Sequence, residues 1–332
     1  MLQMGNTRRH DRWLVTLLAI WLGAGVAFGQ QRSAPERVKA SVEHATFEWL
    51  FLPINVATER GLWTRHDLDP EFSPAAASAQ QLKQQVESGV QIGLVNTAEV
   101  LLARSQGTPV KIVAGYVGAT LAKIFVRANS PMTTARDLDG KRIGVLSETH
   151  TSYRAVSYMN GALGIRAEPV ALGDLGNNVG ALRAGAVDAI YSSEGAALTL
   201  VDSGVLKILV SLPDVYPTPY TAVVIWATDD LIEQRPSTVR AFVATVLEAV
   251  ADLKEHPDHA TALYIEKTTA TRTVADRAVA ELLKFLVPSG RGSGDTLVSA
   301  VEGNWRFTKD SGAVPGGTEV NVQEVVDIRF LP

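Results

Sequence analysis

The sequence predicts an α/β fold whose sheets are largely parallel. From residue 37 to residue 228, short apolar runs of strand length alternate with stretches whose apolar residues recur at helical spacing. Beyond residue 228 only helical patterns remain. Such alternation is typical of sheets flanked by helices. A weak internal repeat and a set of polar loops, taken up below, extend this prediction to two similar lobes.

Eight short apolar runs are predicted as strands. They are Val38–Val42, Ile92–Val95, Lys111–Val117, Ala122–Val126, Arg142–Leu146, Val187–Tyr191, Leu206–Val210 and Ala222–Ala227. Helices are predicted between them, near residues 54–60, 79–87, 97–105, 152–163, 177–184 and 195–202.

The internal repeat relates residues 87–113 to residues 183–209 at a constant offset. Each copy reads as helix end, glycine, strand, polar loop, helix and strand. Gly89 aligns with Gly185, and Lys111 aligns with Lys207. The identity is low and two ordinary α/β units would share some of it, but the shared order of polar and apolar stretches favours two similar lobes.

Polar loops precede predicted helices in each half of the chain. In open α/β sheets, ligands bind beyond the carboxyl ends of the strands, where loops meet helix N-termini. The same side chains are also ordinary helix N-caps, and Ser78 with Gln81 fits a capping box. Residues 147–152 hold more polar groups than one cap can use, which favours a ligand contact. The loops are Ser78-Ala79-Gln80, Asn96-Thr97, Ser147 to Ser152 and Ser192-Ser193-Glu194.

The first 29 residues are predicted to be a secretory signal peptide. Three arginines within residues 8–12 give a basic start, and Trp13–Phe28 is uncharged and mostly apolar. Ala27 and Gly29 place small residues at positions −3 and −1 of a cleavage site. The apolar run is shorter than the ~20 residues that a membrane-spanning helix needs, which disfavours a retained anchor.

Cysteine is absent from the sequence. This excludes disulfides, thiolate metal sites and thiol nucleophiles, and it excludes a lipoprotein because lipid attachment requires a cysteine. Cleavage of the signal peptide removes three arginines and one aspartate, which lowers the formal net charge from −4 to −6. An acidic mature chain argues against nucleic acid and anionic membranes as partners. We therefore expect a soluble monomer in a Gram-negative periplasm.

Five segments in series carry a family resemblance. They are "VATERGLWTRHDLDPEF", "QQLKQQVESGVQIGLVN", "TARDLDGKRIGVLSETHTSY", "LRAGAVDAIYSSEG" and "RPSTVRAFVATVLEAVADLKEHPDHA". In this order and spacing they resemble periplasmic solute-binding proteins of ABC transporters, of the nitrate/sulfonate/taurine and thiamine-pyrimidine (NMT1/THI5-like) type. The resemblance covers residues 37 to about 290.

The resemblance implies a two-lobed periplasmic binding protein (type II) fold, in which each lobe is a mixed, largely parallel sheet flanked by helices. Lobe one would comprise residues 37–123 and 223–332, and lobe two residues 124–222. A small-molecule ligand would bind between the lobes, and hinge closure would bury it. The closed form would then dock on a membrane permease whose ATPase powers uptake. No cofactor is implied.

The same resemblance implies which side chains face the cleft. They are Phe47, Glu48, Trp49, Ser78, Gln80, Asn96, Thr97, Thr149, His150, Thr151, Ser152, Ser192, Ser193, Glu194 and Tyr220. The family commonly has tryptophan, an acid and proline where this chain has Ser193-Glu194-Gly195, which leaves the identity of the ligand open. Arg154 is expected to point away from the cleft.

Two classes of ligand fit these residues. Hydroxyl-lined helix N-termini suit a small anion such as a sulfonate, nitrate or carboxylate. Glu48 and Glu194, with aromatic rings such as Trp49 and Tyr220 nearby, suit an amino-pyrimidine or another aromatic heterocycle. We favour a small organic anion with an aromatic body.

Other classes of protein are less consistent with the sequence. Enzymes of thiamine-pyrimidine synthesis with this fold carry a cysteine-rich motif that this chain lacks, and no G-x-S-x-G elbow occurs. His256 and His259 are separated by a helix-breaking Pro257, which argues against a metal site. Transcription regulators with this fold begin with a DNA-binding domain instead of a signal peptide. A periplasmic protein that presents its ligand to a sensor remains an alternative to uptake.

Overall fold

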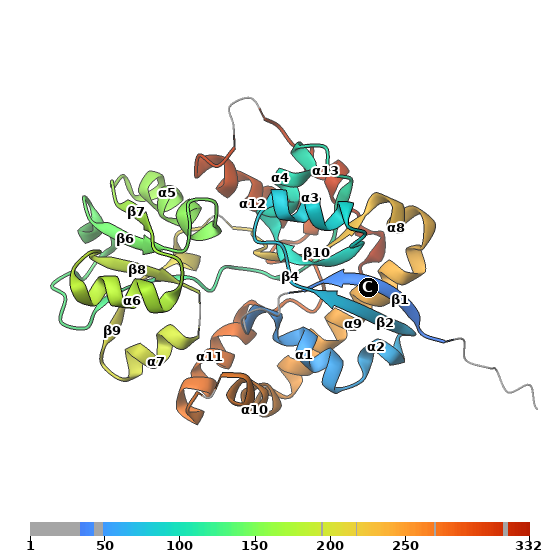
Figure 1. The fold of residues 1–332 in the computed structure, drawn as a ribbon, viewed down its shortest axis with the longest axis horizontal. Coiled ribbons are helices and arrows are strands. Elements are labelled where there is room, and N and C mark those ends of the chain that lie inside the picture. The colour runs from blue at the N-terminus through green and yellow to red at the C-terminus, as the bar shows by residue number, and fades with distance from the viewer. Residues whose placement is uncertain (1–33, 43–48, 194, 217, 269, 315–317) are drawn as a thin grey trace, which may run out of the picture. The chain divides into compact units, whose positions relative to one another are not determined.

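Two five-stranded mixed sheets carry the fold, as the computed structural model shows (Figure 1). The structure describes residues 34–42, 49–193, 195–216, 218–268, 270–314 and 318–332. The predicted signal peptide, with its cleavage site near Gly29, therefore lies outside the described residues.

The first sheet has the strand order β2-β1-β3-β10-β4. Its strands are β1 (Glu36–Ser41), β2 (Leu68–Ser73), β3 (Ile92–Asn96), β4 (Val110–Val117) and β10 (Val223–Thr228). β1 pairs in parallel with β2 and β3, whereas β10 runs antiparallel to β3 and β4. We call this sheet and the helices packed on it lobe one.

The second sheet has the strand order β7-β6-β8-β5-β9. Its strands are β5 (Lys123–Arg127), β6 (Arg142–Val145), β7 (Glu168–Ala171), β8 (Ala189–Ser192) and β9 (Leu206–Ser211). β6 pairs in parallel with β7 and β8, whereas β5 runs antiparallel to β8 and β9. We call this sheet and its helices lobe two.

The two sheets have the same topology, with one antiparallel strand in the fourth place of each. The internal repeat falls on equivalent strands, because β3 and β4 occupy the places in the first sheet that β8 and β9 occupy in the second. The prediction of two similar halves is therefore confirmed. Residues 118–122 and 212–222 connect the sheets.

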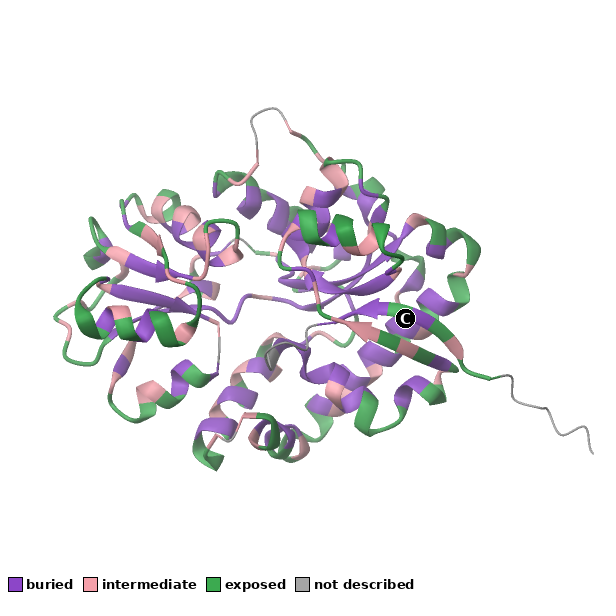
Figure 2. Cartoon of the chain, viewed as in Figure 1, coloured by how far each residue is buried: buried purple, intermediate pink, exposed green. Residues whose placement is uncertain are grey.

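The strands near the middle of each sheet are buried on both faces (Figure 2). Every residue of β8 and β10 is buried, and Trp226 is the largest fully buried side chain. Strands that are covered on both faces read as continuous apolar runs, which is why the sequence predicts them.

Two of the four edge strands, β2 and β7, are absent from the predicted strands. Both are partly exposed, and both contain a proline and acidic side chains, which edge strands tolerate and central strands do not. Their sequences "LDPEFS" and "EPVA" therefore give no apolar signal.

Helices occupy the predicted positions, with ends that differ by a few residues. The α-helices are α1 (Leu52–Glu59), α2 (Leu62–Arg65), α3 (Ala79–Glu87), α4 (Thr97–Ser105), α5 (Thr151–Leu163), α6 (Leu175–Ala184), α7 (Ala196–Asp202), α8 (Asp229–Gln234), α9 (Pro236–Glu255), α10 (Pro257–Thr268), α11 (Arg272–Phe285), α12 (Leu297–Asp310) and α13 (Val322–Val325). The 3₁₀ helices are Trp49–Phe51, Ala135–Leu138, Leu212–Asp214 and Ile328–Phe330. None of the described helices is long and apolar enough to span a membrane.

Candidate functional site: a cavity where the two lobes meet

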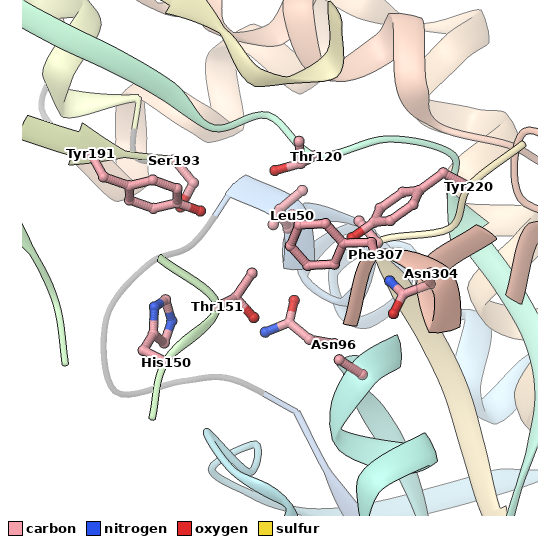
Figure 3. A pocket seen from close by; sticks show the side chains of 12 residues that line it. Leu50, Asn96, Thr120, His150, Thr151, Tyr191, Ser193, Tyr220, Asn304 and Phe307 are labelled. Carbon is pink, nitrogen blue, oxygen red and sulfur yellow. The ribbon is translucent and has the colours of Figure 1, made fainter. Parts of the chain in front are cut away.

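A small cavity lies where strand ends and helix N-termini of both lobes meet (Figure 3). Its volume is about 40 Å³. Because a buried water needs about 10–15 Å³, the cavity as it stands holds only a few waters. The lining residues are Leu50, Asn96, Ala98, Thr120, His150, Thr151, Tyr191, Ser193, Tyr220, Ala222, Asn304 and Phe307. We call it the inner cavity.

The inner cavity is polar but carries no formal charge among the described residues that line it. Hydroxyl groups, two amides and one imidazole supply its hydrogen-bonding groups, and the rest of the wall is apolar or aromatic. A site of this kind holds a solute with fixed dipoles and ring contacts.

The N-terminus of α4 opens onto this cavity without a side-chain cap. Asn96 is the N-cap residue, yet its side chain makes no capping hydrogen bond. Instead its amide extends toward Thr151 of lobe two (Figure 3). The next residue, Thr97, is fully buried, and its hydroxyl donates to the carbonyl of Thr221 at 2.9 Å. The backbone N–H of Thr97 donates to the Ala222 carbonyl at 2.9 Å, and no side-chain cap occupies the N–H groups of the two residues that follow it next to the cavity.

The N-terminus of α5 is capped by a histidine. His150 Nδ1 accepts a hydrogen bond from the backbone N–H of Ser152 at 3.1 Å. The Ser152 hydroxyl is fully buried and accepts from the N–H of Leu146 at 3.0 Å. Burial, and secondarily the charge of Arg154, lowers the pKa of His150 from 6.5 to about 4, so the ring is neutral at pH 7. Of this polar loop, His150 and Thr151 line the inner cavity.

The expectation that Arg154 points away from the cleft is wrong. Its guanidinium reaches across to the carboxylate of Glu99 on α4, and the two side chains are only 6% and 2% exposed. Arg154 also donates to the Thr149 carbonyl at 2.9 Å and to the Thr151 hydroxyl at 2.8 Å. Burial raises the pKa of the Glu99 carboxyl, and the guanidinium opposes that rise. An ionised Glu99 at this position therefore depends on Arg154.

Aromatic rings form one wall of the inner cavity and the layer behind it. The rings of Tyr216 and Phe307 stack at 4.4 Å, and Tyr220 meets them edge-on at 5.4 Å and 6.0 Å. Burial raises the pKa of both tyrosines, so their hydroxyls stay protonated. Packed rings of this kind give a rigid apolar surface.

A second cavity, which we call the outer cavity, lies beside the Glu99–Arg154 pair. Its volume is about 430 Å³. Both partners of the pair line it, together with Ser78, Ala79, Gln80, Leu102, Glu148, Thr149, Tyr153, Ser311, Gly312 and Ala313. Ser78 also caps α3, because its hydroxyl accepts from the N–H of Gln81 at 3.2 Å.

The predicted site residues thus fall into five groups. Asn96, His150, Thr151, Ser193 and Tyr220 line the inner cavity. Ser78, Gln80 and Thr149 line the outer one. Thr97, Ser152 and Ser192 line neither and are buried. Trp49 begins a 3₁₀ helix, whereas Phe47, Glu48 and Glu194 lie outside the described residues.

Several cavity residues were missed by sequence reasoning. Asn304 and Phe307 come from α12, in the helical part of the chain that carried no site signal. Their spacing of three places both on one helix face, which in sequence reads as ordinary packing. Thr120 lies in a segment that connects the two sheets.

The histidines at the end of α9 and the start of α10 contact nearby carboxylates. His256 contacts Asp252 at 3.2 Å, and His259 contacts Glu59 at 3.2 Å. Within the described part of the chain, no group of three or more His, Asp or Glu side chains is placed to hold a metal ion.

The two matched sheets, each flanked by helices, define a two-lobed periplasmic binding protein fold. The chain belongs to the NMT1/THI5 like family, whose model matches residues 50–260.

Individual proteins also resemble this chain. The riboflavin-binding protein RibY of Chloroflexus aurantiacus is 27% identical over 214 residues, which cover 63% of this chain and 60% of RibY, less than two thirds of that protein. The alkanesulfonate-binding protein SsuA of Xanthomonas axonopodis pv. citri, solved with MOPS, has a TM-score of 0.71 at 17% identity and covers 89% of this chain and 99% of its own. A putative sulfonate-binding SsuA of Methylobacillus flagellatus has a TM-score of 0.70 at 18% identity, and the match covers 90% of this chain and 93% of that protein. Both structures share this fold.

Proposed function

We propose that this protein is the solute-binding component of a periplasmic ABC uptake system. It captures a small organic anion with an aromatic body, either sulfonate-like or a carboxylate, in the inner cavity between the lobes. The protein binds this solute and does not transform it. Membership of the NMT1/THI5 like family and the fold shared with sulfonate-binding proteins support this role.

The observation that carries the proposal is the uncapped N-terminus of α4. A helix N-terminus bears partial positive charge and free amides, both of which favour a negatively charged oxygen. N-cap asparagines ordinarily satisfy these amides, but Asn96 turns its side chain into the cavity. An oxyanion held there needs no cationic side chain, in keeping with the uncharged lining.

The aromatic wall supports a ring-bearing solute. Tyr220 and Phe307 present ring surface to the cavity, and Leu50 adds an aliphatic contact. Asn304, which also lines the cavity, donates to the Thr221 carbonyl at 2.8 Å and is thereby held in place. Anionic oxygens at α4 and a ring against Tyr220 would together fix the orientation of a solute.

Lobe movement would both admit the solute and widen the inner cavity, because the cavity as it stands holds only a few waters. We infer that residues 37–123 with 223–332, and residues 124–222, move as the two lobes about the connections at 118–122 and 212–222. Two short connections between rigid sheets are the usual basis of hinge closure.

A binding role rather than catalysis is supported by the contacts of the cavity hydroxyls. The Ser152 hydroxyl lies 3.0 Å from His150 Nδ1, which resembles a nucleophile–base pair. Ser152 is fully buried, however, and both of its partners hold it in the cap of α5. A solute in the inner cavity therefore could not reach it.

The proposal also includes export and docking. The signal peptide would direct the chain to the periplasm, where a permease and its ATPase would accept the closed, monomeric form. Deleting the gene and following uptake of the identified solute by whole cells would test this role.

A thermal-shift screen of purified protein would test the solute class. The panel would hold aryl sulfonates, alkyl sulfonates, benzoates, nitrate, riboflavin and aminopyrimidines. A solute at 100 times its Kd stabilises the folded protein by about 2.7 kcal/mol, which is a visible shift. We expect the largest shifts with aryl sulfonates or benzoates, and shifts confined to nitrate would contradict the aromatic body.

A second candidate solute is an aromatic heterocycle. The stacked rings of Tyr216 and Phe307 behind Tyr220 favour it, as does the relation to a riboflavin-binding protein. The amides of Asn96 and Asn304 can both donate to and accept from a heterocycle edge. If riboflavin or an aminopyrimidine gave the largest thermal shift in the screen, an aromatic heterocycle would be favoured over the organic anion as the solute.

A further inference from the structure

Glu99 and Arg154 join the two lobes by a buried ion pair. Glu99 lies in the first turn of α4, and Arg154 lies in the first turn of α5, helices that Figure 1 shows in different lobes. Among ion pairs of the described residues, no other has both side chains less than 9% exposed. The pair therefore exists only when the lobes are together.

Arg154 connects this pair to the polar loop of residues 147–152, which we call the ligand loop. The guanidinium that meets Glu99 also donates to the Thr149 carbonyl and to the Thr151 hydroxyl, at 2.9 Å and 2.8 Å. Thr149 lines the outer cavity, and Thr151 lines the inner one. One planar guanidinium makes all these hydrogen bonds. Its position therefore sets both the conformation of the ligand loop and the position of that loop relative to α4 of lobe one.

The pair also lies at the border between the two cavities. On α4, Ala98 lines the inner cavity and Glu99 the outer one.

A buried ion pair contributes to stability differently when it is intact and when one partner is removed. Burying both charges is costly, so the pair adds little net stability compared with two neutral side chains. Removing one partner leaves an uncompensated buried charge, and that is strongly unfavourable. In the open form both side chains would reach water, so this penalty would fall on the closed form alone.

We propose that Glu99 and Arg154 form a closure latch that fixes the closed arrangement of the lobes and positions the ligand loop in it. The latch rests on the proposed function in so far as lobe closure serves solute capture. Arg154 is a positioning residue for Thr151.

The absence of cysteine allows a direct test without any solute. Spin labels on Gln84→Cys in α3 and Ala162→Cys in α5, two exposed positions, report the distance between the lobes by pulsed electron paramagnetic resonance. Glu99→Gln and Arg154→Gln are each compared with the doubly labelled parent and with the double variant E99Q/R154Q. The matched control is Arg104→Gln, which removes an ion pair on the same helix, with Asp229 of lobe one at 2.6 Å.

The closure latch predicts that the effects of the two substitutions on the interlobe distance are not additive. Each single variant should raise the population with the longer distance between the spin labels at least tenfold. The double variant should restore most of the population with the short distance. Arg104→Gln should leave the distance distribution unchanged. Short distances that persist in both single variants would overturn the latch, as would a double variant as open as the singles. If one single variant fails to fold, the other and the double still decide. Since no solute is used, these outcomes stand even if the solute screen fails.

Discussion

The hydroxyl of Tyr264 occupies the space that a side chain at Gly195 would need. A Cβ on Gly195, the N-cap of α7 in lobe two, would lie only 1.7 Å from the Tyr264 oxygen on α10. Tyr264 is itself 2% exposed, so it has little room to move. The absence of a side chain at residue 195 is therefore required for the two helices to approach.

Gly195→Ala should oppose lobe closure. The added methyl group would overlap the Tyr264 hydroxyl and also approach the ring carbon at 2.9 Å, which forces α7 away from α10. We expect a longer interlobe distance in the spin-label measurement and at least tenfold weaker solute binding. Tyr264→Phe in the same chain should recover part of the loss, and no recovery would contradict the steric account.

Thr151 and Ser152 are neighbours with different predicted roles. Thr151→Ala should weaken solute binding by about 1–2 kcal/mol, because it removes a hydroxyl that lines the inner cavity and that accepts a hydrogen bond from Arg154. Ser152→Ala should leave the N–H of Leu146 buried without a partner and lower the free energy of unfolding by about 1–3 kcal/mol. Calorimetric titration and urea unfolding of both variants measure the two effects. Equal effects of the two changes on affinity would contradict the assignment.

His150 should make stability depend on pH. Because its pKa is about 4 in the folded protein and 6.5 ordinarily, the neutral ring contributes full stability above pH 6.5. This contribution is lost as the pH falls toward 4, and the loss reaches about 1.4 kcal/mol at pH 5.5. His150→Asn keeps a capping acceptor without a titratable group. Urea unfolding from pH 7.5 to 5.0 should show a weaker pH dependence in this variant, and an identical profile would refute the role of His150.

Tyr216→Phe should not destabilise the protein. The Tyr216 hydroxyl is buried and has no hydrogen-bond partner in the described part of the chain, while its ring stacks on Phe307 at 4.4 Å. Removal of an unsatisfied buried hydroxyl with the ring retained is expected to raise the free energy of unfolding by up to about 1 kcal/mol. A loss of more than about 1 kcal/mol in urea unfolding would show that the hydroxyl has a structural role.

The fold was predictable because its central strands are buried on both faces. Continuous apolar runs such as Val223–Thr228 are visible in sequence, and the repeat marks β3 and β8 as equivalent. The edge strands β2 and β7 were not visible, since exposure and proline remove the apolar signal.

The lining of the candidate site was predictable only where a local rule applied. Polar residues between a strand and a helix identify Asn96 and His150, because strand ends and helix N-termini meet at sheet edges. Asn304 and Phe307 arrive from a distant helix by tertiary packing, for which the sequence holds no local signal. The direction of Arg154 was mistaken because its partner, Glu99, is 55 residues away on the other lobe.

The central claim is that the inner cavity holds a solute against the uncapped N-terminus of α4. Isothermal titration of wild type and Asn96→Ala with the strongest solute from the screen tests it most directly. The account predicts one site per chain, affinity at least tenfold weaker in the variant, and solute recovered chemically unchanged. Equal affinity in the two proteins, or a solute converted to product, would contradict it.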